Sequence, residues 1–359
     1  MFSDGSGFEK NNQEVIHIAL SIWDLTDTYN RHAGVAMVSI LENTKNPVHF
    51  HLLYDRERSN HDMECARENY FHYKSLEEKY DTKITFHHTD IPDWINEIPF
   101  IQIYTASSVL RFFILDLFPD LDKVLYLDTD IVVRLDIAEI WGQNIGNFDL
   151  AARSGKLPFA RRRNYQRRNI NYDNYFNSGV ILFNLKEIRS KKITSSDLFS
   201  CLKVNQDLGW PDQDVLNMVF KSVFILPEKY NLLANKSNLT VMDGAVFHFA
   251  GRVKPWNTYL GGVDKYYWEY LLVSPWGEKK EEVMQYLLEA PHIDNSLKRI
   301  PQYFKQLTPV VLLTELWNIS IVIPINVIIA DLKYLILFRI FGKNKIFQIS
   351  NNDINGNYY

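Results

Sequence analysis

The sequence has little cysteine and no strong bias of charge, and each absence argues against a class of protein. Only Cys65 and Cys201 occur among 359 residues, which argues against a disulfide framework and favours a reducing compartment. The formal net charge is −4, so we expect no nucleic-acid partner. Hydrophobic residues nevertheless make up 46% of the chain, enough for the core of one large domain or two smaller ones.

The two ends of the chain differ in character from its middle. Residues 1–14 are polar and lack the basic start and apolar centre of a signal peptide, so we expect a disordered leader. Residues 316–347 combine basic side chains with an apolar run, which polar residues break before it reaches the about 20 residues of a spanning helix. The interrupting residues are Asn318, Pro324, Asn326 and Asp331, and the basic ones are Lys333, Arg339, Lys343 and Lys345.

This pattern predicts a helical extension over 273–347, in which 316–347 bind an anionic membrane surface, followed by a polar tail at 348–359. The alternative is a helix that packs on the domain or on a second subunit. The membrane interpretation, together with the polar leader, predicts a cytoplasmic protein that is peripheral on the inner face of the cell membrane.

Strand-like and helical patterns alternate over the first part of the chain. The expected strands are 15–22, 48–55, 83–90 and 123–128, and the segments between them with helical or amphipathic patterns are 33–44, 59–80 and 105–119. This order predicts an α/β fold with a mostly parallel sheet and helices on both faces. In such sheets ligands bind beyond the carboxyl ends of the strands.

The second part of the domain is less regular. Strands are expected at 148–152 and 176–185, helices at 186–205 and 211–220, and a further strand within 244–256 that runs into a Gly/Pro turn. Between the first two strands lies a polar loop with five arginines: Arg161, Arg162, Arg163, Arg167 and Arg168. This loop is either a solvated face, a cover for the site, or a binding surface for an anionic acceptor or lipid phosphate.

Two carboxylates follow an apolar strand in the stretch VLYLDTDIVV. Asp128 and Asp130 are separated only by Thr129, so in an extended chain they point the same way. Two like charges near a core need a positive partner, and a divalent cation such as Mg²⁺ or Mn²⁺ prefers oxygen ligands of this kind. Most Asp-x-Asp triplets are solvated loops, but this one lies between two apolar stretches, which favours a function.

A histidine and a lysine near the end of the domain suit the same site. His248 ends an apolar strand in FHFAGRVKPW, and imidazole suits Mn²⁺ better than Mg²⁺. A single histidine there would more often be a satisfied core residue. Gly251, however, lets backbone amides approach a phosphate, and Lys254 adds a point charge.

Four segments together resemble glycosyltransferase family 8. KVLYLDTDIVV, YFNSGVILFNL, PDQDVLN and HFAGRVKPW occur in the order found in that family, and the resemblance covers roughly residues 15–272. It implies a bacterial enzyme with a GT-A fold, which is a Rossmann-like, mostly parallel sheet with helices on both faces. It also implies metal-dependent, retaining transfer of a hexose from UDP-glucose or UDP-galactose.

The resemblance assigns the metal and the nucleotide. It implies that Asp128, Asp130 and His248 hold Mn²⁺, or Mg²⁺ in its place, which grips both phosphates of UDP, with Thr129 beside them. Gly251 and Lys254 would contact the diphosphate. Asp24 and Tyr29, in IWDLTDTYN, stand where the family binds uracil and ribose, although the usual Ala-Asp-Asp-Asn run is shorter.

The resemblance also assigns the donor sugar. It implies that Arg111, in SSVLRFF, faces the sugar and phosphate, and that Asn177, Asp212 and Gln213 surround the sugar. Arg153 and Ser154 stand where the family often has an acidic residue, which leaves glucose, galactose and N-acetyl sugars open as donors.

Retention of configuration needs a nucleophile beneath the sugar or attack from the face of the leaving group. The residue beneath would be Gln213, whose neutral amide is a poor nucleophile, so same-face attack is favoured, with Asp212 binding sugar hydroxyls. Each of these residues also has an ordinary local role: Asn177 in a turn, Asp212 as a helix N-cap, and Gln213 as a solvated residue of the first helical turn.

The main interpretation is an enzyme that builds a cell-surface glycan, glycolipid or glycoprotein. The alternative is a non-catalytic protein that retains the fold and binds nucleotide sugars or a membrane, and the intact Asp128, Asp130, His248 and Lys254 argue against it. A two-carboxylate hydrolase is disfavoured, because its carboxylates must be about 5 Å or more apart across the substrate. The acceptor, the donor hexose and the oligomeric state remain open.

Overall fold

The computed structural model describes residues 13–23, 29–55, 63–98, 101, 106–155, 165, 168, 170, 174–234, 243–251, 254–256 and 262–277. All of them belong to the first of two compact units, Met1–His292. The predicted leader and C-terminal extension lie outside the described residues, except for 13–14 and 273–277. Among the helices of these described ranges, none has the length and apolar character needed to cross a membrane.

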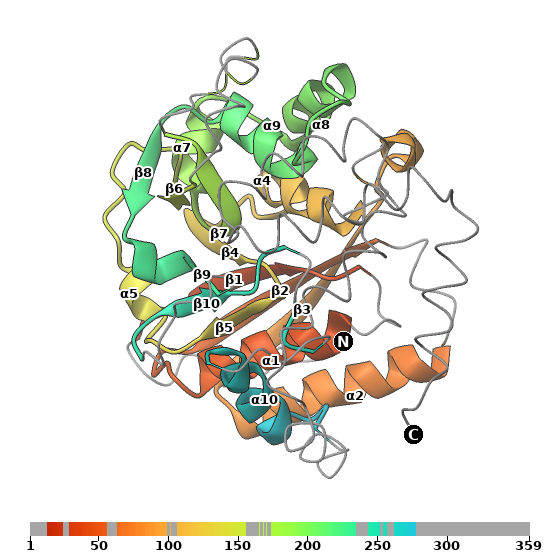
Figure 1. Cartoon of the computed structure of the whole chain (residues 1–359), viewed down its shortest axis with the longest axis vertical. Coiled ribbons are helices and arrows are strands. Elements are labelled where there is room, and N and C mark those ends of the chain that lie inside the picture. The colour runs from red at the N-terminus through yellow and green to blue at the C-terminus, as the bar shows by residue number, and fades with distance from the viewer. Residues whose placement is uncertain are drawn as a thin grey trace, which may run out of the picture. The chain divides into compact units, whose positions relative to one another are not determined.

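A seven-stranded sheet forms the centre of the first unit (Figure 1). Its strands, in spatial order, are β3 (Thr82–Thr89), β2 (Val48–Asp55), β1 (Ile16–Ser21), β4 (Lys123–Leu127), β7 (Phe176–Asn184), β6 (Leu150–Ser154) and β8 (Val223–Leu226). Only β7 runs against the others, since it pairs antiparallel with β4 and β6 while the remaining neighbours are parallel. This confirms the predicted mostly parallel sheet.

A smaller sheet of three strands has the order β5 (Ile131–Val133), β10 (Val246–His248), β9 (Leu232–Leu233). Antiparallel pairing of β10 with β5 sets His248 opposite Ile131, the residue that follows Asp130. This pairing brings the two predicted metal-binding regions of the sequence side by side.

Helices cover both faces of the large sheet, as Figure 1 shows. One core includes α1 (Tyr29–Leu41), α2 (Met63–Lys79), α5 (Ala138–Trp141) and α10 (Asp264–Val273), together with the small sheet. The other includes η2 (Asp93–Glu97), η3 (Ala106–Phe113), α4 (Ile114–Leu117), α7 (Leu185–Ser190), α8 (Ser195–Val204) and α9 (Pro211–Val219). Alternate residues of a central strand enter opposite cores, as in Leu125 and Tyr126 of β4.

Two predicted helices differ in detail from the structure. The stretch 186–205 forms two helices, because Lys192 has a positive φ of 59° and Asp197 accepts hydrogen bonds from the backbone and hydroxyl of Thr194, which starts α8 anew. The predicted helix 105–119 is a 3₁₀ helix, η3, followed by the short α4. Both helix types bury one apolar stripe, so the sequence pattern does not separate them.

Candidate active site

The carboxylate pair lies where the large and small sheets meet. Asp128 follows β4, and its backbone N–H donates to Gly179 O of β7 at 2.9 Å. The carbonyl of Asp130 accepts from the Phe249 N–H, also at 2.9 Å, just beyond β10. Because β7 runs antiparallel to β4, the start of β7 and the end of β4 lie at the same edge. The turn that carries both aspartates is therefore fixed from two sides.

His248 completes a group of three metal-ligating side chains. Its Nε2 lies 3.6 Å from Asp128 Oδ2 and 3.3 Å from Asp130 Oδ1, and one ligand atom from each residue lies within 4.8 Å of the others. Two carboxylates and an imidazole form a donor set that suits Mn²⁺. The structure thus brings together the three predicted ligands, and they fit the predicted ion.

Two residues that sequence reasoning missed hold His248 in place. The Oδ1 of the buried Asn231, in η5 (Glu228–Asn231), accepts from His248 Nδ1 at 2.9 Å, and its Nδ2 donates to Asn177 Oδ1 at 2.8 Å. An oxygen at that position favours the tautomer with a proton on Nδ1, which leaves Nε2 as the ligand atom. A Cβ on Gly179 would overlap the His248 ring. Glycine in FNSG is the one sequence signal for this close approach.

Arg111 balances the charge of Asp128. The buried guanidinium contacts Asp128 Oδ1 through Nη2 at 2.9 Å and Asp212 Oδ2 through Nε at 3.4 Å, while Nη1 donates to Ser178 O at 2.8 Å. It lies over the ring of Tyr126, whose hydroxyl donates to Asp128 at 2.8 Å. Burial opposes the charge, but the neighbouring Asp128 raises the pKa of Arg111 above its ordinary value.

Lys254 balances the charge of Asp130. Its ammonium contacts the Asp130 carboxylate and donates to Phe249 O at 2.7 Å. Burial opposes ionisation of Asp130, but Lys254 and His248 together hold its pKa well below the usual range. Gly251, between His248 and Lys254, has a φ of 92°, a conformation that favours glycine. A positively charged side chain beside each aspartate explains how the two carboxylates are tolerated next to the core.

Gln213 is fixed by hydrogen bonds at the start of α9. Its carbonyl Oε1 accepts from Asn177 Nδ2 and from the Ser178 N–H, both at 3.0 Å, and its Nε2 donates to Tyr175 OH at 2.7 Å. Tyr175 in turn donates to Asp214 at 2.7 Å. The interpretation of Gln213 as a solvated residue of the first turn is therefore wrong, and so is that of Asn177 as a turn residue, since Asn177 lies within β7.

Asp212 does not cap α9. The helix has Trp210 at its N-cap position, and Asp212 is buried against Arg111 and Ser178. Burial raises the pKa of Asp212, while Arg111 opposes the rise. A buried carboxylate at the edge of the metal-ligating group is suited to accept hydrogen bonds from sugar hydroxyls.

The predicted uracil side of the site is described in part. Asp24 lies outside the described residues. Tyr29 begins α1 and packs edge-on against His32, whose ring stacks on Trp256 of the KPW segment with centroids 3.6 Å apart. Thr129 is buried between the aspartates. Tyr29 is thus connected to the lysine segment through aromatic contacts.

Arg153 and the one described arginine of the loop have local partners. Arg153 is buried and contacts Glu228 at 2.5 Å. Of the arginine-rich loop, Arg168 is described and pairs with Asp207, while Arg161, Arg162, Arg163 and Arg167 lie outside the described residues. The three interpretations of the loop stay predictions.

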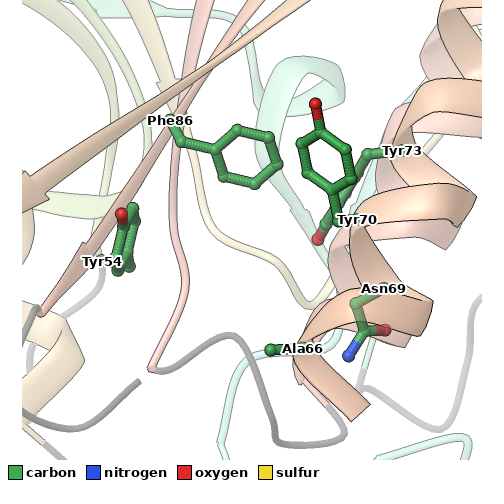
Figure 2. Close-up of a pocket in the computed structure, with 6 residues that line it drawn as sticks. All are labelled: Tyr54, Ala66, Asn69, Tyr70, Tyr73 and Phe86. Carbon is green, nitrogen blue, oxygen red and sulfur yellow. The ribbon is translucent and has the colours of Figure 1, made fainter. Parts of the chain in front are cut away.

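A separate cavity of about 250 Å³ lies between α2 and the strands β2 and β3 (Figure 2). It is lined by Tyr54, Ala66, Asn69, Tyr70, Tyr73 and Phe86. None of these side chains is a carboxylate or a cation, and none belongs to the metal-ligating group. The cavity is therefore not the site that the sequence motifs predict.

Comparison with known proteins agrees with the geometry. The model of the family Glycosyl transferase family 8 matches residues 21–259, more than half of the chain. A lipopolysaccharide 1,2-glucosyltransferase of Escherichia coli is 29% identical over 71% of this chain and 78% of its own length. A lipopolysaccharide 1,3-galactosyltransferase of Salmonella typhimurium is 27% identical over 68% of this chain and 74% of its own length.

A solved structure shows the same fold. The galactosyltransferase LgtC, in complex with donor and acceptor sugar analogs, superposes with a TM-score of 0.58 at 24% identity, over 72% of this chain and 96% of that one. This confirms the predicted GT-A fold. The matching family model, the ordered motifs and the fold together show that the chain belongs to glycosyltransferase family 8 and is a hexosyltransferase.

Proposed function

We propose that the protein transfers glucose or galactose from a UDP-sugar to a lipopolysaccharide-type glycan, with retention of configuration and with Mn²⁺ bound by Asp128, Asp130 and His248. One observation carries the proposal: these three side chains converge within 4.8 Å beside the two cations Arg111 and Lys254. A diphosphate leaving group needs positive charge of this density. The names of the two lipopolysaccharide-modifying relatives support the acceptor class.

The protein's own residues would stabilise the departing UDP. A divalent ion supplies Lewis-acid charge at the diphosphate when bound. Lys254 reaches the Asp130 carboxylate in this structure, so its ammonium is within reach of a phosphate held at the same carboxylate. Arg111 is locked by Asp128, Asp212 and the Ser178 carbonyl, so it offers a fixed charge that costs no reorganisation during the reaction.

The donor sugar would lie against β7 and the start of α9. Asp212 would accept hydrogen bonds from sugar hydroxyls, and Asn177 and Gln213 would fix the position of the ring. The carbonyl oxygen of Gln213 already accepts hydrogen bonds from Asn177 and Ser178, which leaves it little nucleophilic character. This supports same-face attack, in which the leaving phosphate takes the proton of the acceptor hydroxyl.

The cellular setting follows from the acceptor class and from the tail. Lipopolysaccharide-type acceptors are amphiphilic, and 316–347 have the composition of an interfacial, basic segment. The proposal therefore places the enzyme in the cytoplasm, peripheral on the inner face of the membrane.

The test is a donor screen. The full chain is incubated with UDP-glucose, UDP-galactose and their N-acetyl counterparts plus Mn²⁺, and UDP release is measured with and without extracted lipopolysaccharide. One hexose donor should be hydrolysed slowly alone and faster with acceptor, and EDTA or Asp130→Ala should remove most of the activity. Equal UDP release by Asp130→Ala, with its fold intact by circular dichroism, would exclude the proposed metal site.

A further inference from the structure

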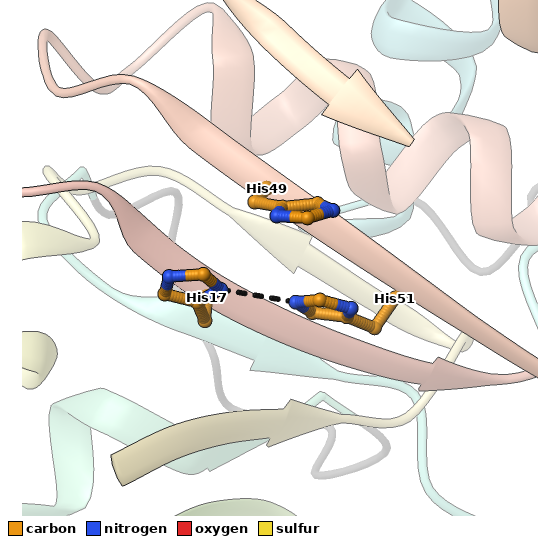
Figure 3. A group of neighbouring side chains, drawn as sticks. All are labelled: His17, His49 and His51. Atoms are coloured by element: carbon orange, nitrogen blue, oxygen red, sulfur yellow. Dashed lines mark hydrogen bonds between the residues drawn. The ribbon is translucent and has the colours of Figure 1, made fainter. Parts of the chain in front are cut away.

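A second group of metal-ligating side chains lies on the central sheet. The parallel register of β1 and β2 sets His17 opposite His49, and the alternation of a strand points His51 to the same face as His49. One ring nitrogen of each histidine lies within 4.8 Å of the others. Figure 3 shows the three rings gathered over the two strands.

This histidine group is distinct from the donor site. His17 and His49 are the second residues of β1 and β2, whereas Asp128 follows the last residue of β4. Since β1 and β4 are parallel, the amino-terminal edge that carries the histidines is opposite the edge that carries the carboxylates. The proposed sugar transfer has no need of these rings.

Hydrogen bonds orient the histidines toward one another. His17 Nδ1 and His51 Nε2 are 3.0 Å apart, and His51 Nδ1 is 3.0 Å from Nε2 of His87 on β3. The hydrogen bond to His87 uses Nδ1 of His51, so the other ring nitrogen, Nε2, is directed at His17. His49 is held in a similar way by Thr85 Oγ1, 2.8 Å from its Nε2. Histidines that bind metals are commonly fixed by such a bond from the second ring nitrogen.

We propose that His17, His49 and His51 bind a late first-row divalent ion, with Zn²⁺ as the physiological candidate, that ties β1 to β2. Zinc, nickel and copper bind imidazole nitrogens readily, whereas magnesium and calcium prefer oxygen ligands. Zinc–nitrogen bonds of about 2.0–2.1 Å place tetrahedral ligand atoms roughly 3.3 Å apart, so small ring rotations convert the observed group into a ligand set.

The surroundings favour the neutral rings that a metal requires. Burial, reinforced by neighbouring histidines and Lys83, lowers the pKa of His49 to about 4 and that of His51 to about 2. Lys83, the register partner of His49, adds a positive charge that opposes cation binding. The ion is therefore held by nitrogen bonds and not by charge, which distinguishes this site from the carboxylate pair.

The test uses Zn²⁺ as the probe and the full chain without a polyhistidine tag. Asp128→Asn and Asp130→Asn are introduced first, so that the donor site takes up little metal. Titration calorimetry should then show one Zn²⁺ per chain, with a rise in the melting temperature. Co²⁺ should give the visible absorption of a nitrogen-ligated site. If the protein with these two substitutions binds no Zn²⁺, the proposal is overturned, whether or not any further variant folds.

Single substitutions then locate the ion. His17→Gln and His49→Gln should each weaken Zn²⁺ binding about tenfold or more, because each removes one of three ligands. His88→Gln is the matched control, since His88 is exposed and its strand position points to the other face from His87. Unchanged affinity in both ligand variants, or an equal loss in His88→Gln, would show that zinc binds elsewhere and would overturn the assignment.

Discussion

At the scale of single residues, charge balance explains how the donor site is built. Asp128 is held by Arg111 and Tyr126, and Asp130 is held by Lys254 and His248. Each aspartate therefore has a local cation even without a metal. A cation bound at Asp130 would compete with the ammonium of Lys254 for the same carboxylate, which places that ammonium beside any diphosphate the metal binds.

Gln213 offers a test of the reaction course. Gln213→Ala should lower turnover ten- to a hundredfold, about 1.4–2.7 kcal/mol of barrier, because the amide fixes Asn177, which the proposed function places beside the sugar. UDP affinity should barely change, since in the proposed function the metal ligands and Lys254 would hold the diphosphate. Steady-state kinetics and UDP titration separate the two effects. Gln206→Ala, at an exposed glutamine, is the matched control.

Gln213→Glu sharpens this test by supplying a true nucleophile. Intact-mass spectrometry with the donor should then show one added hexose on the variant and none on the parent. A hexose on the unmodified parent at Gln213 or Asp212 would replace same-face attack by double displacement. Loss of UDP binding in Gln213→Ala would mean that the residue lies on the diphosphate side of the donor.

Gly179 tests the packing of the metal ligands. A methyl group at this position would overlap the His248 ring, so Gly179→Ala should destabilise the fold by about 1–3 kcal/mol and weaken Mn²⁺ binding. The effect should be coupled to the histidine: in a double-mutant cycle, Gly179→Ala should cost much less in a His248→Ala background. Denaturant unfolding measures the cycle, and strictly additive effects would locate the clash elsewhere.

At the scale of elements, the sequence predicted the alternation but not every boundary. Strand residues such as Leu125 and Tyr126 show their buried character in the pattern itself. The reversed direction of β7 and the role of Asn231 in orienting His248 depend on tertiary pairing, which local patterns do not encode. The break near Lys192 had a local signal in Thr194 and Asp197, a capping pattern that the expected single helix over 186–205 passed over.

That break leads to a prediction about stability. Asp197 accepts hydrogen bonds from the backbone N–H and the hydroxyl of Thr194, at 2.8 and 2.9 Å. Asp197→Ala should lower the free energy of unfolding by about 1 kcal/mol, with little change in activity. Ser196→Ala, one residue earlier and exposed, is the control. Equal denaturation midpoints for the two variants would contradict a stabilising role for the cap.

At the scale of the whole molecule, buried histidines should make stability depend on pH. Burial, helped by Arg31, lowers the pKa of His32 to about 3, and burial with neighbouring histidines lowers that of His51 to about 2. The unfolded chain takes up protons near the ordinary value of 6.5. The unfolded state thus binds more protons in mild acid, so each ring contributes stability above pH 6.5 that is lost progressively below it.

Between pH 6 and 4 the free energy of unfolding should fall by about 1.4 kcal/mol per pH unit for each of these two histidines. Urea unfolding at several pH values, with EDTA present to exclude metal binding, measures the slope. His51→Gln should reduce the slope, and His88→Gln, at an exposed ring, should not. A flat profile in the parent protein would contradict neutral, buried rings.

The last prediction concerns membrane attachment, which stays a prediction because 316–347 lie outside the described residues. Deleting 316–347 should move the protein from the membrane fraction to the soluble fraction. Donor hydrolysis should be largely retained, because Asp128, Asp130 and His248 all precede the deleted segment. The basic side chains should add salt-sensitive affinity of about 1 kcal/mol each for anionic vesicles.

Neutralising that charge separates attachment to lipid from packing on protein. Replacing Lys333, Arg339, Lys343 and Lys345 by glutamine keeps the apolar run and removes four positive charges. On a membrane-binding segment, this variant should float poorly with anionic vesicles in a gradient, and high salt should release the parent in the same way. On a helix that packs against the domain or a second copy, vesicle binding would be absent from the start. Deletion would then lower the melting temperature or the oligomeric state instead, and that result would replace the membrane anchor by a protein contact.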